Sequence, residues 1–144
     1  MSGKSEQPPK LLIVSPVRDE AAYLQTTIDS VVAQTIRPAR WVIVDDGSSD
    51  ETPNIVERAA ARHEWIQLYR RTDRGRRKVG GGVVEALNDG LRQVNLDDYD
   101  YLCKLDGDLR LSIRYFELLF RKFDADPRLA TASGKCWLVT PRGL

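Results

Sequence analysis

Residues 41–53 of the chain read WVIVDDGSSDETP, and this stretch decides the fold. Its first four residues are apolar, as in a short buried strand, and the six that follow are turn formers. Thr52 then offers a helix cap, and Pro53 suits the first helical position. Apolar residues recur at helical spacing from there to about His63. The stretch therefore predicts a strand, an acidic turn and a helix in direct succession.

The same alternation extends in both directions from this stretch. Short apolar runs predict further strands at 11–14, 66–69 and 101–105, and helical periodicity predicts helices at 23–34 and 80–94 and one from a Ser112 cap through Phe123. Strands that alternate with helices in this way form right-handed βαβ units. We therefore expect an α/β fold with three layers, α/β/α, around a mainly parallel sheet.

The C-terminal segment 129–139 is apolar enough to predict one or two more strands. No helix follows to cover them, so we expect a domain that is truncated there. Residues 1–9 are polar and predict a disordered leader before a domain at 10–144.

Composition excludes several classes of protein. The formal net charge of the 144 residues is +1, which gives no global reason to expect nucleic acid or a membrane surface as partner. No apolar run approaches the ~20 residues needed to cross a bilayer, so we expect membrane association only through segments outside this chain. Cys103 and Cys136 lie in apolar stretches and are too few for a disulfide framework, which predicts reduced, buried thiols in a cytoplasmic protein.

Acidic residues follow three of the predicted strands, at 15–20, 45–47 and 106–108. The carboxyl ends of parallel strands meet at one edge of a sheet, so we expect these carboxylates to point into one cleft. Several carboxylates in one cleft repel unless a cation neutralises them. Asp106 and Asp108, two apart across a glycine, suit a hard cation such as Mg²⁺ or Mn²⁺, although an isolated turn of this kind is mostly a solvated loop.

These segments together resemble the family 2 inverting glycosyltransferases of the GT-A fold. The matching pieces are residues 14–20 (VSPVRDE), 44–52 (VDDGSSDET), 81–90 with its Ala-Leu-Asn, and 105–108 (LDGD), in the same order and spacing. The resemblance implies a domain that binds a nucleoside-diphosphate sugar, a UDP-sugar in the first place, through Mn²⁺ or Mg²⁺. It also implies transfer of the sugar with inversion to a hydroxyl acceptor. The catalytic base of the family lies further along, so we expect it beyond residue 144 and expect this chain alone to be inactive.

The resemblance also implies roles for single residues. Asp46 would accept a hydrogen bond from the nucleobase, while Pro16 and Arg18 would line the base and ribose pocket. Asp106 would approach the ribose or the metal, and Asp108 would ligate the metal. Glu20 comes from the same segment as Pro16 and is assigned to the donor site, as is Asn88 of the third helix. One departure from the family is Arg18-Asp19, which replaces a common aromatic-Asn pair.

Six cations fall within the nine residues 70–78. Such a run is often only a solvated loop, but it can also cover a cleft and contact a diphosphate, for which Lys78 is the first choice. A nucleic-acid patch is a third interpretation, and the absence of interleaved aromatics argues against it. The glycines at 80–82 suit a phosphate cradle or tight packing equally well.

Other conspicuous residues are interpreted as structural. His63, near a helix end, has no role in the predicted chemistry. Trp41, Trp65 and Trp137 are expected to pack in the core, unless a missing acceptor half uses Trp137 for stacking. Two other functions stay open. One is a non-catalytic nucleotide-binding or partner-docking fragment with an exposed sheet edge at 129–139. The other is a nucleotidyltransferase, against which stands the lack of a glycine-rich loop after the first strand.

Overall fold

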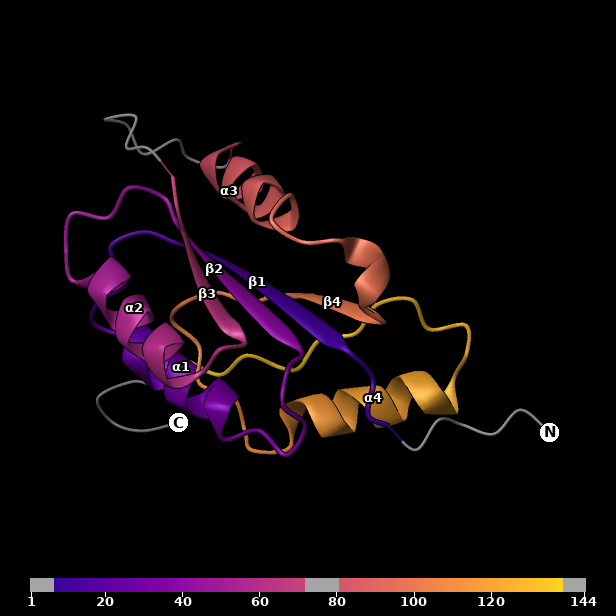
Figure 1. Ribbon diagram of the computed structural model, residues 1–144. Coiled ribbons are helices and arrows are strands. Elements are labelled where there is room, and N and C mark those ends of the chain that lie inside the picture. Colours follow the sequence, from indigo (N-terminus) through magenta and orange to yellow (C-terminus); the bar gives the residue numbers. More distant parts are fainter. Residues whose placement is uncertain (1–6, 72–80, 139–144) are drawn as a thin grey trace.

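The computed structural model describes residues 7–71 and 81–138, which form one parallel sheet flanked by helices (Figure 1). The strands pair in the order β3-β2-β1-β4, and every pair is parallel. The elements in chain order are β1 (Leu11–Val17), α1 (Leu24–Val32), β2 (Arg40–Asp45), α2 (Thr52–Arg62), β3 (Ile66–Arg70), α3 (Gly81–Leu91), the 3₁₀ turn η1 (Leu96–Asp98), β4 (Tyr101–Lys104) and α4 (Tyr115–Ala125).

The sheet separates two apolar layers, so the predicted three-layer α/β/α fold is confirmed. Alternate residues of β1 point to opposite faces, with Leu12 and Val14 packing beneath α3 and Leu11 and Ile13 packing in the larger core with α1, α2 and α4. Figure 1 shows α3 alone on one face and the other three α-helices on the opposite face. Because both faces of β1 and β2 are covered, these strands are continuous apolar runs.

The two buried tryptophans fill the larger core, as predicted. Trp41 is fully buried and its indole N–H donates to the Ser15 hydroxyl at 2.9 Å. Trp65 is also buried and stacks at a tilt against His63, which ends α2 as its C-terminal cap. The prediction for Trp137 is wrong, because its side chain is 73% exposed.

β1 runs three residues further than predicted and includes Pro16. Proline has no backbone N–H, so its place in a strand needs an explanation. The backbone groups of Val14 face β4, where the Val14 carbonyl accepts from Leu105, and those of Pro16 face the same way by alternation. The β4 ladder has already ended there, with the last pair at Val14 and Lys104. The missing N–H therefore breaks no ladder bond.

Both predicted helix caps are wrong. The caps of α2 and α4 are Glu51 and Arg114, and neither makes a side-chain capping bond. Thr52 lies inside α2, and its hydroxyl accepts from the backbone N–H of Glu20 at 2.9 Å. Ser112 contributes its backbone carbonyl, which accepts from the Gln34 side chain. In both places the polar group makes a contact with a residue far away in sequence, which the local sequence does not reveal.

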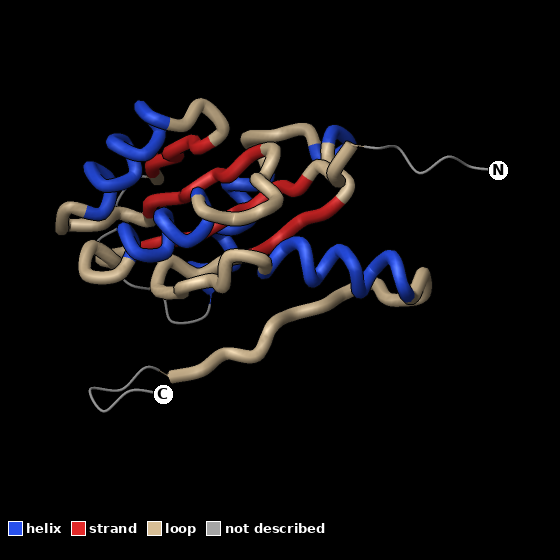
Figure 2. Tube along the Cα trace, turned by 90° about the horizontal axis from the view of Figure 1, so that it is seen from below, coloured by secondary structure: helices blue, strands red, loops and turns tan. Residues whose placement is uncertain are grey.

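The strands predicted at the C-terminus do not form within residues 129–138. Figure 2 shows an extended segment that follows α4 and runs back beneath the molecule, without a neighbouring strand. It contacts the rest of the chain at Gly134, whose N–H donates to the Tyr115 hydroxyl at 3.1 Å. A strand needs a neighbouring strand for its backbone groups, and this segment pairs with no strand among the described residues. The partner-docking sheet edge predicted there is therefore absent from this segment.

The two cysteines differ. Cys103 is half-buried and packs against the larger core, as expected, and burial raises its pKa to about 11, which keeps the thiol protonated and unreactive. Cys136 is exposed on the extended segment, which contradicts the prediction of a buried thiol. None of the helices in the described ranges is long and apolar enough to span a membrane.

Candidate functional site

The carboxyl ends of all four strands lie at one edge of the sheet. From β1 the chain steps outward to β2 and then β3, and then crosses back to place β4 on the other side of β1. This reversal makes a switch point between β1 and β4, where open parallel sheets bind their ligands. Pro16 is the penultimate residue of β1, Arg18 directly follows that strand, and Asp106 lies just beyond β4. The topology therefore brings the predicted base, ribose and metal residues to one edge.

Arg71 is the centre of a group of three carboxylates at this edge. Its guanidinium contacts Asp46 Oδ1 at 2.5 Å, Asp89 Oδ2 at 2.7 Å and Glu85 Oε2 at 3.3 Å. The side chain of Arg71 is only 6% exposed, whereas Asp46 is 25% exposed. A planar guanidinium can hold several carboxylates in fixed directions at once. The end of β2 is thus tied through Arg71 to α3.

The positive charge of Arg71 and the negative charges of its three carboxylate partners stabilise one another. Burial opposes the charge of Arg71, but the hydrogen bond that it donates to Asp89 and the negative charge of Asp46 outweigh this effect and raise the pKa of Arg71. Asp89 also pairs with the exposed Arg92 at 2.9 Å. Without Arg71, three carboxylates would face one another in a partly desolvated place, which is unfavourable.

In the sequence Arg71 is only one member of the basic run, for which Lys78 is the predicted diphosphate contact. Lys78 lies at 72–80, outside the described residues. A signal for Arg71 existed in the strand pairing, because β2 and β3 are parallel and Asp45 pairs with Arg70. The next residues along, Asp46 and Arg71, are then neighbours beyond the strand ends. This neighbourhood follows only from the pairing register of β2 and β3, which the sequence alone does not supply.

The loop after β1 is clasped to the loop after β2. The Asp19 carboxylate accepts from the Ser49 backbone N–H at 2.8 Å, and the Asp19 N–H donates to the Ser48 hydroxyl at 2.9 Å. Ala21 N–H donates to Asp50 at 3.1 Å. Asp50 is mildly desolvated, but its hydrogen bonds from Thr52 lower its pKa. The clasp holds the two loops that carry Arg18 and Asp46.

Asp19 has a positive φ of 51°, in the left-handed region that asparagine and aspartate tolerate better than other non-glycine residues. Its role in the clasp needs only a carboxylate or amide oxygen as acceptor, so the replacement of the common asparagine preserves the loop. Arg18 and Glu20 are both half-buried beside it. The Glu20 carbonyl accepts from Tyr23 and Leu24, which starts α1.

The Asp106-Gly107-Asp108 turn is anchored by its glycine. A Cβ at Gly107 would lie 2.8 Å from Val17 Cγ1, and the Gly107 carbonyl accepts from the buried Thr27 hydroxyl at 2.9 Å. The glycine is thus required for packing on the end of β1. The flanking carboxylates of Asp106 and Asp108 are exposed, and Asp106 pairs with Lys104.

Within residues 7–71 and 81–138 no three acidic, histidine or cysteine side chains gather closely enough to hold a metal ion by themselves. The predicted convergence of all the carboxylates is therefore only partial, since Asp46 is taken up by Arg71 and Asp19 by Ser49. Asp106, which also pairs with Lys104, and Asp108 are two exposed oxygen donors on one turn. That donor set fits Mg²⁺ or Mn²⁺, which take one or two carboxylates and complete their shell with phosphate oxygens and water.

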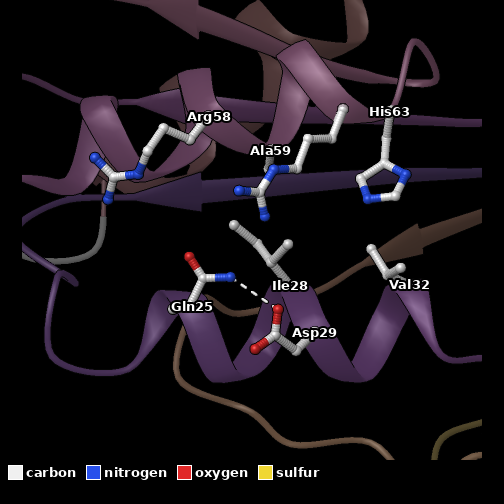
Figure 3. Close-up of a pocket in the computed structure, with 8 residues that line it drawn as sticks. Gln25, Ile28, Asp29, Val32, Arg58, Ala59 and His63 are labelled. Atoms are coloured by element: carbon white, nitrogen blue, oxygen red, sulfur yellow. Dashed lines mark hydrogen bonds between the residues drawn. The ribbon is translucent and has the colours of Figure 1, made fainter.

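The remaining features lie off this edge or beside it. Asn88 is exposed on α3, and it is its neighbour Asp89 that bonds to Arg71. A pocket lies between α1 and α2 (Figure 3), where side chains such as Gln25 and Asp29 face Arg58. It contains none of the predicted site residues, so we do not assign it to the candidate site.

Residues 12–135 match the family described as glycosyl transferase family 2. The match spans most of the chain, and the chain belongs to this family.

Among curated proteins, the chain is similar to the poly-beta-1,6-N-acetyl-D-glucosamine synthases of Staphylococcus aureus and Staphylococcus epidermidis. Each is 26% identical over 116 residues, which cover 81% of this chain and 26% of the synthase. The chain thus spans about a quarter of the length of these relatives.

Two solved structures share the fold. TarS 1-349 of S. aureus in complex with UDP superposes with a TM-score of 0.65 at 20% identity, over 81% of this chain and 32% of that one. The mannosyltransferase PcManGT from Pyrobaculum calidifontis, in complex with GDP-Man and Mn²⁺, gives a TM-score of 0.63 at 26% identity, over 85% of this chain and 34% of that one. The GT-A fold expected from the sequence is therefore confirmed.

Proposed function

We propose that residues 10–144 are the nucleotide-sugar-binding domain of a glycosyltransferase that transfers a sugar, with inversion, to a hydroxyl acceptor. The observation that carries the proposal is the placement of Asp46, Asp106 and Asp108 at the carboxyl edge of an all-parallel sheet, in a chain of glycosyl transferase family 2. Parallel sheets bind nucleotides at this edge.

In this proposal the nucleoside lies over the ends of β1 and β2. Asp46 accepts an N–H of the base, Pro16 and Arg18 line the base and ribose, and Glu20, Lys78 and Asn88 complete the donor site. The exposed quarter of the Asp46 side chain supports its role, because it lets a ligand reach the carboxylate. A UDP-sugar is our first candidate. The similarity to a mannosyltransferase solved with GDP-Man makes GDP the natural comparison.

Asp106 and Asp108 are the residues that would hold Mn²⁺ or Mg²⁺. Their exposure on one turn supports this role, as does the Mn²⁺ in the mannosyltransferase. A divalent cation there supplies neutralisation of the charge that builds on the leaving nucleoside diphosphate. The part of the chain described here orients the donor. The general base that deprotonates the acceptor would come from sequence beyond residue 144, as would the acceptor site, and the chain alone would then bind donor without turnover.

Calorimetric titration of UDP and of GDP, each with and without Mn²⁺, tests the proposal. We expect one nucleotide to bind and Mn²⁺ to tighten it. Asp108→Asn should remove the tightening, whereas Asp98→Asn, an exposed aspartate in η1, should not. Absence of binding of both nucleotides, or tightening that survives Asp108→Asn, would contradict the proposal.

A further inference from the structure

Asp46 would be poorly suited to select a nucleobase if its side chain were free to rotate. A partly exposed aspartate samples several rotamers, and each rotamer aims its oxygens differently. In this structure one oxygen, Oδ1, is held by Arg71 Nη1 at 2.5 Å, and the Arg71 backbone N–H donates to the Asp45 carbonyl at 2.9 Å. Arg71 is thus fixed by its backbone as well as by its head group. The oxygen that this leaves for a ligand is Asp46 Oδ2.

The other side of Arg71 is fixed by α3. Asp89 and Glu85 lie one helical turn apart on the same face, and both accept from the guanidinium. With its side chain only 6% exposed, Arg71 cannot swing into solvent without breaking its contacts with Asp46, Glu85 and Asp89. The direction of the Asp46 carboxylate is therefore set, through Arg71, by α3, which packs over β1 and β2.

We propose that Arg71 is a positioning residue that holds Asp46 so that Oδ2 accepts a ring N–H of the nucleobase. The inference rests on the proposed function and adds to it the residue that makes Asp46 selective. A base that carries hydrogen on its ring nitrogen, uracil or guanine, satisfies this oxygen. A base with a bare ring nitrogen at that place presents a lone pair to a carboxylate, which is repulsive.

The test uses UDP and N3-methyl-UDP, in which a methyl group replaces the ring N–H that would donate to Asp46. For the wild-type chain we expect about tenfold or more tighter binding of UDP, as for a hydrogen bond to a charged group. Arg71→Gln should reduce the ratio to about threefold or less. The matched control is Arg70→Gln, which makes the same change at the neighbouring arginine; that side chain is 58% exposed and lies outside the Arg71 group, so this variant should keep the wild-type ratio. If the chain prefers GDP, the same comparison is made with N1-methyl-GDP.

Arg71→Lys is a second variant in case Arg71→Gln fails to fold, because lysine keeps a positive charge among the three acids. A lysine ammonium is a single point charge and cannot span them, so we expect the ratio to fall here too. An unchanged ratio in both Arg71 variants overturns the inference alone. Failure of the wild-type chain to bind either nucleotide contradicts the proposed function, and the inference falls with it. A wild-type chain that binds without discrimination overturns the role of Asp46 and hence that of Arg71.

Discussion

Gly90 is the place where α3 approaches the sheet, and its replacement by alanine gives the sharpest test of this packing. A Cβ there would lie 2.7 Å from both Val14 Cγ1 and Val44 Cγ2. Both valines are fully buried, and β-branched side chains have little rotameric freedom to move away. Overpacking of this kind costs about 1–3 kcal/mol. Alanine regains about 1 kcal/mol in helix propensity. Because two rigid contacts are violated at once, we expect Gly90→Ala to destabilise the protein by about 1–2 kcal/mol.

Urea unfolding followed by circular dichroism measures this effect. The midpoint for Gly90→Ala should fall by roughly 0.5–1 M. Gly81→Ala is the matched control on the same helix, since a Cβ there meets nothing within 4 Å, and it should leave the midpoint unchanged or raise it. Adding Val44→Ala to Gly90→Ala should cost less than the sum of the two single changes, because it makes room for the new methyl group. A Gly90→Ala midpoint at or above the wild-type value would refute the reasoning.

Three further changes test the loops and α4. Asp19→Asn keeps an acceptor and should preserve the urea midpoint, whereas Asp19→Ala loses the clasp and should lower stability by about 1 kcal/mol; equal midpoints would contradict the clasp. Gly107→Ala places a methyl group against Val17 and should cost about 1–3 kcal/mol in the same assay. Glu117 has its pKa lowered to about 2, from 4.5, first by the hydrogen bond from Arg114. Because the folded-state pKa is the lower one, its contribution is present above pH 4.5 and is lost as the pH falls towards 2. Stability should therefore decline less steeply over this range in Glu117→Gln, and identical pH profiles would count against the ion pair.

The strands and helices could be predicted because burial imposes simple patterns. β1 and β2 are covered on both faces, so each is a plain apolar run, and the α-helices carry their apolar residues at helical spacing. The end of β1 was misplaced because proline usually ends a strand. Whether Pro16 breaks the ladder depends on where β4 stops, and that is a property of the assembled sheet.

The chemistry of the strand ends was predictable only in part. Asp46, Asp106 and Asp108 stand directly after strands, so their place at one edge follows from a parallel sheet. Arg71 has no local signature, since its partners Asp46 and Asp89 are 25 and 18 residues away in sequence. Thr52 was expected to cap its own helix, yet its hydroxyl bonds a backbone group 32 residues away. Long-range polar contacts of this kind produce no periodic pattern in the sequence.

The strand order has a consequence for how the protein is made. β1 is synthesised first and can pair with β2 as soon as residue 45 has left the ribosome. Its other edge must wait for β4, which is so distant in sequence that the contact between Lys10 and Asp100 spans 90 residues. At translation rates of about 5–20 residues per second, the wait lasts roughly 3–12 s. During that time the nascent chain carries an apolar strand with one unpaired edge. Such an edge can pair with other chains and start aggregation, and chaperones can bind it.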